Sequence, residues 1–430
     1  MQLSGIGRKM AHLSGLRGIM EDIATSMDAS ADRQWLNLGI GNPAAIPEVT
    51  ATWQRMTAEA LADSFHDTSC RYGPSRGLPR LVDAIVAYFN ERYGWDIGPR
   101  NVVVGPGSQM LAFIAAALFT GADGDRDTKL VLPMSPDYTG YQGLSMTPGG
   151  IVGIEPVVAT GGHDDRSFRY LFDLPALERQ KDVGLLLVST PGNPTGRCAS
   201  PAEIHSLVAA AEDHDVPLMV DNAYGAPFPG IANPAAPPVR HERIVNCFSL
   251  SKAGLPGERL GFAIGEERHI DPIVSFLANC TLHAPQLVQS ALARALETGA
   301  LDTMVEKAIS PFYARRRTFV ESLLVESLPA GISWRMYAAE GGMFCWIWVD
   351  EDWFDDLRMY RVLKERGVFI VPGRHFFTDP EHSTGLGRHP RQCFRVSITA
   401  DEATLAAGIE VIGQVLTDMH AGTSRVPANT

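Results

Sequence analysis

Residues 102–119 have the sequence VVVGPGSQMLAFIAAALF, which predicts the local fold of this part of the chain. The first three residues are β-branched and favour a strand, and the Gly-Pro-Gly at 105–107 ends it. Residues 108–119 are apolar and rich in alanine, as expected of a helix. The stretch therefore predicts a strand, a tight turn and a helix.

The same alternation continues along the chain. Short apolar runs that indicate strands lie at 130–132, 184–189, 217–220, 244–248 and 260–264, and residues 201–214 favour a helix. Continuous apolar strands separated by helices are typical of a mostly parallel sheet covered on both faces. We therefore expect an α/β fold with a large, mostly parallel sheet.

Beyond residue 311 the pattern changes and predicts a smaller α/β domain. Strands are expected at 343–349, 368–371 and 394–398, with a helix at 357–366, and residues 422–430 read as a frayed tail. The first 47 residues show few strong periodic signals, and we expect them to pack with the small domain or to cross the cleft. The predicted division is an N-terminal segment (1–47), a large domain (48–310) and a small domain (311–430).

Composition narrows the class of protein. The chain has 430 residues, 45% of them hydrophobic and 20% charged, with a formal net charge of −12. These values describe a globular protein and disfavour nucleic acid as a partner, because binding to phosphates needs clustered Lys and Arg. The six cysteines are scattered, which indicates neither a zinc site nor a disulfide framework. No signal peptide or membrane span is recognisable, so we expect a cytoplasmic location.

Lys252 is the most informative single residue. It lies in the run SLSKAGLPGER at 249–259, directly after a predicted strand and seven positions before Arg259. Burial near other cations lowers the pKa of a lysine amine and makes it a nucleophile. The run therefore suggests a covalent catalyst beside an anion site. Considered alone, however, a lysine in a loop is usually solvent-exposed.

Two turns at the ends of predicted strands carry polar groups. Ser108 and Gln109 begin the predicted helix 108–119, where free N–H groups and the helix dipole attract anions. A plain helix cap explains Ser108 equally well. The turn STPGNPTG at 189–196 is rigid and holds the amide of Asn193 at the end of a strand, although such a turn is often only structural.

Two charged residues lie within or at the end of apolar strands. Asp221 ends the strand at 217–220, and a buried carboxylate there needs a cationic partner such as a protonated ring nitrogen. Arg395 lies inside the strand at 394–398, and its planar guanidinium matches a carboxylate. The alternatives are a turn aspartate and an arginine that faces water from an edge strand.

Together these motifs resemble the pyridoxal-phosphate-dependent aminotransferases of fold type I. The order is Gly-Ser-Gln, Asn-Pro-Thr-Gly, Asp-x-x-Tyr, Ser-x-Ser-Lys with a following Arg, and an Arg in a strand. The likeness covers nearly the whole chain and is strongest to the valine–pyruvate aminotransferase subgroup. The stretches that carry this narrower likeness lie at 19–22, 41–48, 94–97, 221–231 and 254–257. The spacing of Lys252 and Arg259 also matches that subgroup and is one residue shorter than in most fold type I aminotransferases.

The resemblance implies a role for each matching residue. Lys252 would bind pyridoxal 5′-phosphate covalently and move the substrate proton, and Asp221 would keep the pyridine nitrogen protonated. Arg395 would hold the substrate carboxylate, with Gly41 and Asn193 beside it. The remaining cofactor contacts would be Asn193 and Tyr224 at the phenolic oxygen, Tyr138 on the ring, and Ser108, Gln109, Ser249, Ser251 and Arg259 at the phosphate. Tyr72 would reach the phosphate of the other subunit, which implies a homodimer.

The implied reaction is amino-group transfer between valine or alanine and a 2-oxo acid such as pyruvate or 2-ketoisovalerate. A lyase, cyclase or oxidase with the same cofactor remains the alternative, because the same carbanion can react onward. A non-enzymatic regulator is disfavoured, because the sequence offers no spare basic segment. Arg374 departs from the subgroup: an added cation in the cleft would admit an acidic side chain, but a surface arginine is the preferred interpretation.

Overall fold

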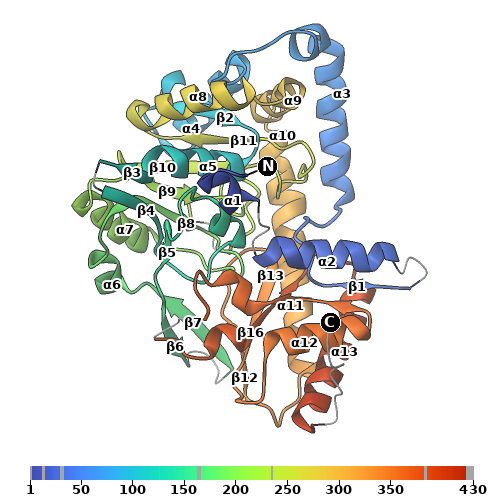
Figure 1. The fold of residues 1–430 in the computed structure, drawn as a ribbon. Coiled ribbons are helices and arrows are strands. Elements are labelled where there is room, and N and C mark those ends of the chain that lie inside the picture. The colour runs from blue at the N-terminus through green and yellow to red at the C-terminus, as the bar shows by residue number, and fades with distance from the viewer. Residues whose placement is uncertain are drawn as a thin grey trace.

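The computed structural model describes residues 2–11, 15–29, 33–124, 126–161, 166–233, 236–381 and 385–422. Its larger sheet has the strand order β2-β11-β10-β9-β8-β4-β3, with β5 paired to β4 (Figure 1). The strands are β2 (Val102–Gly105), β3 (Gly121–Asp123), β4 (Arg126–Leu132), β5 (Ile151–Gly153), β8 (Val183–Ser189), β9 (Leu218–Asp221), β10 (Ile244–Ser249) and β11 (Gly261–Ile264). The pairs from β5 through β4, β8 and β9 to β10 are parallel, and the pairs at either end are antiparallel.

A smaller sheet has the order β15-β16-β13-β12-β7-β6. Its strands are β6 (Val157–Thr160), β7 (Ser167–Leu171), β12 (Trp334–Tyr337), β13 (Phe344–Val349), β15 (Val371–Pro372) and β16 (Cys393–Ser397). The antiparallel pair β6 and β7 reaches this sheet from between two strands of the larger one, through the pairing of β7 with β12. The mixed large sheet and the smaller sheet confirm the predicted α/β fold type.

Successive residues of each strand point to opposite faces of the larger sheet, and both faces are buried. Val103 and Met219 pack on the side of α5 (Ser108–Phe119) and α8 (Glu267–Thr281). Val220 packs on the opposite side with α7 (Pro201–Asp213), while α6 (Leu174–Glu178) also contacts α7. The strands β2 and β11 are covered by α3 (Pro47–Ser69), α4 (Pro79–Tyr93) and α9 (Gln286–Glu297). Helices thus cover both faces, as continuous apolar strands require.

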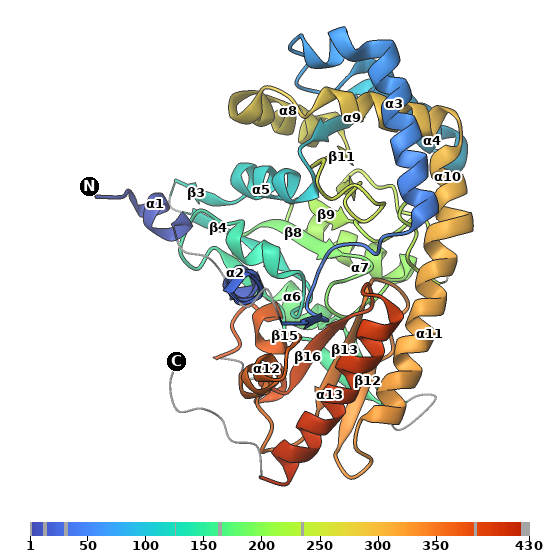
Figure 2. The same ribbon diagram turned by 90° about the vertical axis from the view of Figure 1, so that its right-hand side faces the viewer.

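Of the remaining helices, α10 (Ala300–Met304) packs against α9 and α3, whereas α11 (Ser310–Ser327), α12 (Asp356–Glu365) and α13 (Glu402–His420) pack in the region of the small sheet. The short helical turns are η1 (Pro99–Asn101), η2 (Thr139–Gly143), η3 (Val305–Ile309), η4 (Gly373–Phe376) and η5 (His389–Arg391). In Figure 2, α11 runs along one side of the molecule past both sheets. Its buried residues share one apolar core with α3, α9 and α13, so the two sheet regions are joined by packing.

The N-terminal segment contains α1 (Gly5–Met10), α2 (Gly15–Ala29) and β1 (Leu36–Asn37). β1 pairs in parallel with β14 (Val368–Phe369), and Ser397 donates its N–H to the carbonyl of Leu38 over 2.7 Å. The segment is therefore joined to the small sheet region by backbone hydrogen bonds, while α2 lies at the junction between the two sheets (Figure 2).

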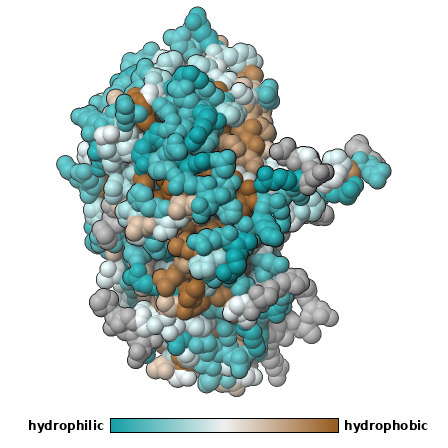
Figure 3. All heavy atoms as spheres, turned by 90° about the vertical axis from the view of Figure 1, so that its left-hand side faces the viewer, coloured by the Kyte–Doolittle hydropathy of each residue, from teal (hydrophilic) through white to brown (hydrophobic). Residues whose placement is uncertain are grey.

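Hydrophilic side chains cover most of the face in Figure 3, with apolar patches between them. Within the described ranges, no helix has the length and apolar character needed to cross a bilayer. Each of the six cysteines is a free thiol, as their spacing predicts. Residues 423–430, nearly all of the expected tail, lie outside the described residues.

Candidate active site

Lys252 lies in the turn directly after β10, and its side chain enters a cavity of about 530 Å³. Its Nζ donates to the carbonyl of Gly41 over 2.5 Å and lies 5.8 Å from the ring centre of Tyr224. Burial first, and then the charges of Arg395 and Arg259, lower the pKa of Lys252 to about 8, while the charge of Asp221 opposes them. A substantial fraction of this amine is therefore neutral near physiological pH, as a nucleophile requires.

Asp221 is the last residue of β9 and is only 6% exposed. Burial raises the pKa of Asp221 to about 6, although the Tyr141 hydroxyl, the Ala223 N–H and the charge of Lys252 lower it. Tyr141 donates to Oδ2 over 2.9 Å and Ala223 donates to Oδ1 over 3.0 Å. A buried carboxylate held by two neutral donors is suited to bind a cationic ring nitrogen.

Arg395, on β16, is 2% exposed and closes the other end of the cavity. Its Nη1 donates to Oδ1 of Asn193 over 2.9 Å, and its Nη2 donates to the carbonyl of Gly39 over 2.8 Å. The guanidinium lies 3.9 Å from the ring centre of Phe344, and its Nε has no hydrogen-bond partner among the described residues. Burial lowers the pKa of Arg395 to about 10. Because no carboxylate in the described part of the chain forms an ion pair with this buried charge, an anionic ligand would be strongly favoured there.

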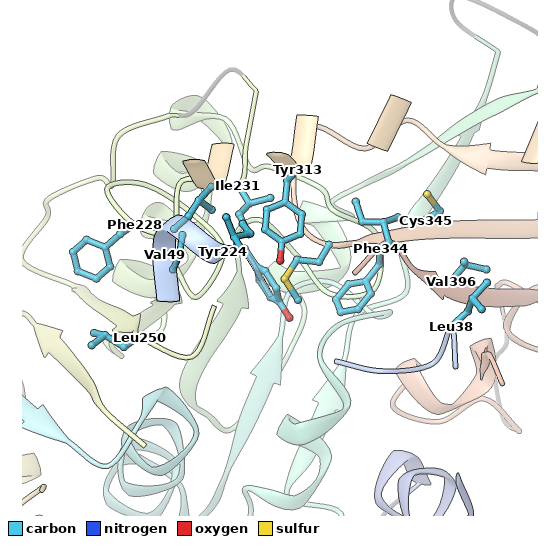
Figure 4. Close-up of a cluster of buried hydrophobic side chains, with 14 of the residues drawn as sticks. Leu38, Val49, Tyr224, Phe228, Ile231, Leu250, Tyr313, Phe344, Cys345 and Val396 are labelled. Atoms are coloured by element: carbon cyan, nitrogen blue, oxygen red, sulfur yellow. The ribbon is translucent and has the colours of Figure 1, made fainter. Parts of the chain in front are cut away.

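Tyr224 and Phe344 form the boundary between this cavity and the apolar core. Their ring centres are 6.1 Å apart, and Figure 4 shows them between Phe228 on one side and Val396 on the other, with the hydroxyl of Tyr224 pointing away from Phe228. Burial raises the pKa of Tyr224 above its usual range. Its phenol therefore remains protonated and can act as a hydrogen-bond donor.

An anion-binding end lies where α5 begins. Gly107 has φ of +90°, and a Cβ at this position would approach Nη2 of Arg259 to 2.6 Å. Nη1 of Arg259 donates to Oγ of Ser251 over 3.1 Å, and the N–H of Ser251 donates to Oγ of Ser249 over 3.2 Å. A helix N-terminus, an arginine and serine hydroxyls thus surround a space that only glycine leaves open.

The family model for aminotransferase class I and II matches residues 33–412. The chain belongs to the class I and II aminotransferases. Valine–pyruvate aminotransferase of Escherichia coli (strain K12) is 32% identical over 420 residues, which cover 96% of this chain and 98% of that protein. The crystal structure of valine–pyruvate aminotransferase from Salmonella typhimurium LT2 has a TM-score of 0.82 at 29% identity, covering 93% and 99% of the two chains. A structure from Psychrobacter arcticum 273-4 reaches 0.92 at 30% identity, covering 98% and 99%.

The cofactor of this aminotransferase is pyridoxal 5′-phosphate, and the cavity fits it. The anion-binding end has the donors that a phosphate needs, and Asp221 lies in the same cavity as Lys252. The predicted site residues line this one cavity with the exception of Tyr72; they are Gly41, Ser108, Gln109, Tyr138, Asn193, Asp221, Tyr224, Ser249, Ser251, Lys252, Arg259 and Arg395. The side chain of Gln109 also contacts the loop of Tyr138, because its Nε2 donates to the carbonyl of Gly140 over 3.0 Å.

Tyr72 lies outside the cavity of its own chain and is 86% exposed. Its ring lies edge-on to His283, 6.1 Å away. Such exposure is unusual for a tyrosine in the fold of one subunit, and it leaves the side chain accessible to a second chain.

Arg374 requires a correction. The expectation of a surface arginine is wrong: its side chain is 13% exposed and forms ion pairs with Asp355 and Asp356. Its Nε donates to Oδ1 of Asp356 over 2.7 Å, so its charge is already neutralised. It is not among the residues that line the cavity, so it does not supply the added cation in the cleft that was the alternative.

Sequence reasoning missed several residues of the site. Tyr141, the hydrogen-bond donor to Asp221, lies three positions after Tyr138 in η2, where residues three apart share a face. The side of the cavity facing α2 was also missed; it is lined by Met20, Ile23, Ala24 and Met27. Their spacing of three, four and seven residues is a helical signal that could have revealed this wall.

Proposed function

We propose that this aminotransferase moves an amino group between a small aliphatic amino acid, valine or alanine, and a 2-oxo acid, pyruvate or 2-ketoisovalerate. The observation that carries the proposal is the combination of Arg395, suited to an α-carboxylate, with the apolar wall of α2 across the same cavity. The similarity to two valine–pyruvate aminotransferases supports the same substrate pair.

The charges of the cavity favour an aliphatic side chain over an acidic one. Among its described lining residues the cations are Lys252, Arg259 and Arg395. Lys252 is assigned to the cofactor, Arg259 to the phosphate and Arg395 to the α-carboxylate. No further cation is left in that lining for a side-chain carboxylate, and desolvating such a group without a partner is costly.

The proposed roles follow from the contacts. When bound, pyridoxal phosphate supplies an electron sink for the substrate carbon that carries the amino group. Asp221 accepts a hydrogen bond from the ring N–H, and Tyr224 and Asn193 donate to the phenolic oxygen. Ser108, Gln109, Ser249, Ser251 and Arg259 hold the phosphate, with Gln109 acting through its backbone N–H. Arg395 and Gly41 orient the substrate, and Nζ of Lys252 takes the proton from the substrate Cα.

We further propose a cytoplasmic homodimer in which Tyr72 completes the partner's phosphate site. Other exposed apolar residues precede Tyr72 on α3 or lie beside its neighbour His283, namely Leu61 and Phe65 on α3 and Leu282 after α8. Leu61 and Phe65 lie on either side of a kink in α3 at Ser64, where φ is −137°. Exposed apolar patches of this kind mark protein interfaces. We retain the proposed division of the chain at 47/48 and 310/311, except that β6 and β7 of the middle segment belong to the smaller sheet.

Half-reaction spectra test the function. Valine or alanine should convert the bound cofactor to its amine form, and pyruvate or 2-ketoisovalerate should restore it. A lyase, cyclase or oxidase would give product without this reversible pair of spectra. Lys252→Ala should lose both turnover and the absorbance of the covalently bound cofactor. Retention of that absorbance in the variant would refute the assignment of Lys252.

A further inference from the structure

Asp137 is a buried carboxylate that has no role in the proposed chemistry. It is 4% exposed and immediately precedes Tyr138, the residue proposed to stack on the cofactor ring. Its Oδ1 accepts the N–H of Tyr138 over 2.6 Å and also accepts the hydroxyl of Ser189, while the N–H of Ser189 donates to Oδ2 over 3.3 Å. The side chain therefore ties the Tyr138 loop to β8.

The position of Ser189 means that its bond to Asp137 links the Tyr138 loop to the wall of the cavity. Ser189 ends β8, lies opposite Asp221 in the strand register and lines the cavity. One carboxylate thus joins the loop that carries the proposed stacking ring to the strand beside the proposed ring-nitrogen partner. Burial raises the pKa of Asp137 to about 7, although its hydrogen bonds from Ser189 and the N–H of Tyr138 lower it.

The loop is also held on its far side. Gln109 at the start of α5 donates to the carbonyl of Gly140, and a Cβ on Gly140 would lie 2.3 Å from the ring of Tyr138. The ring is therefore confined between a clamp at residue 137 and a clamp at residue 140. Rigid support of this kind is what keeps a binding group in its productive position.

The backbone of Asp137 connects the loop to the substrate end. Its N–H donates to the carbonyl of Phe376 over 3.1 Å, and the ring centre of Phe376 lies 5.1 Å from the guanidinium of Arg395. Residue 137 thus contacts the support of the proposed carboxylate site as well as that of the proposed cofactor site.

We propose that Asp137 is a positioning residue that holds the ring of Tyr138 against the cofactor by bonding to Ser189 and to the Tyr138 backbone. This inference rests on the proposed role of Tyr138. Removal of the Asp137 side chain would leave the N–H of Tyr138 and both donors of Ser189 without their acceptor in a buried site, so the loop would shift or loosen. The energetic consequence should appear first in cofactor binding.

The test compares apo-proteins by their dissociation constants for pyridoxal phosphate and by their unfolding temperatures. Asp137→Ala should weaken binding by about tenfold or more, since leaving buried donors unsatisfied costs roughly that much. Asp137→Asn keeps one oxygen for the N–H of Tyr138 and the hydroxyl of Ser189 but turns its amide nitrogen toward the N–H of Ser189, so binding should be restored in part, between that of Asp137→Ala and the wild type. Ser189→Ala, which removes one donor, should lie between them.

Asp302→Ala is the matched control, because it removes a partly buried carboxylate that accepts the hydroxyl of Tyr88 outside the cavity. It should lower the unfolding temperature of the apo-protein but change the dissociation constant by less than about threefold. Wild-type-like binding by Asp137→Ala, or failure of Asp137→Asn to rescue, overturns the proposal. Failure of the proposed function is distinguishable, since it shows in the wild type and in Lys252→Ala, not in this series.

Discussion

Tyr141 donates its hydroxyl to Oδ2 of Asp221 over 2.9 Å, and both groups are buried. This bond lowers the pKa of Asp221, but the opposing effect of burial is larger and raises it to about 6. In the apo-protein the carboxylate is therefore charged at physiological pH at an energetic cost, which a protonated ring nitrogen would offset. The site is arranged to receive a cation at this carboxylate.

Asp221→Asn should stabilise the apo-protein at pH 8 while abolishing most activity. The pKa of Asp221 is raised from 3.8 to about 6, so its ionisation destabilises the fold as pH rises above about 4, and fully above about 6. Removing the charge should gain roughly 3 kcal/mol at most, less about 1 kcal/mol for a weakened hydrogen bond. Urea unfolding at pH 4 and pH 8 measures this gain. An equal effect at both pH values would show that ionisation of the carboxylate is not the source of the gain.

Arg395→Gln should shift the pH dependence of cofactor attachment upward. Covalent attachment requires neutral Lys252, whose pKa of about 8 reflects burial first and the charge of Arg395 second. Attachment to the wild-type apo-protein should therefore accelerate as pH rises through about 8, and the midpoint should move toward higher pH in the variant. The rate of absorbance change after mixing provides the measurement. Arg80→Gln, which breaks an exposed ion pair with Glu297, serves as the control and should leave the midpoint in place.

Ala24→Leu should narrow the range of amino donors. Ala24 lies on the apolar wall of α2 that faces the cavity, so a larger side chain there reduces the space for the substrate side chain. The kcat/KM for valine should fall about 10- to 100-fold more than that for alanine. Ala29→Leu adds the same bulk at an exposed position outside the cavity lining and should leave the ratio unchanged. A parallel loss for both donors would show that the wall does not select the side chain.

Mixed dimers should test the proposed role of Tyr72. Chains with Lys252→Ala and chains with Tyr72→Ala would be inactive or weak on their own. A mixed dimer contains one site with both native residues if Tyr72 serves the partner, because Lys252 then comes from one chain and Tyr72 from the other. Refolding the two chains together should therefore yield more activity than the mean of the parents. Activity equal to that mean would place both residues in a single-chain site or outside it.

The sequence was sufficient for the parts of the fold that depend on local pattern. The runs at 184–189 and 244–248 are continuously apolar because both faces of β8 and β10 are covered, and this burial is visible without a structure. Placing Ser189, Asp221 and Lys252 at or just after strand ends was enough to bring them to one edge of the sheet.

Other features depend on tertiary contacts that no single stretch encodes. An arginine such as Arg374 is usually found on the surface. Only the folded structure shows that Asp355 and Asp356, at the start of α12, neutralise its charge. The bond between Asp137 and Ser189 joins residues 52 apart, and neither residue alone signals it. The apolar wall of α2 could be predicted in part. The helical spacing of its apolar residues is present in the sequence, but the position of the helix over the cavity depends on packing across the junction of the sheets.

The bond between Arg395 and the carbonyl of Gly39 joins groups separated by 356 positions along the chain. Contacts of such high sequence separation form late in folding, because the entropy of closing a long loop opposes them. The part of the cavity that Arg395 lines should therefore assemble after the larger sheet. During synthesis, residue 39 emerges long before its partner exists, so a nascent chain that has formed only the larger sheet would still lack the proposed site for the substrate carboxylate.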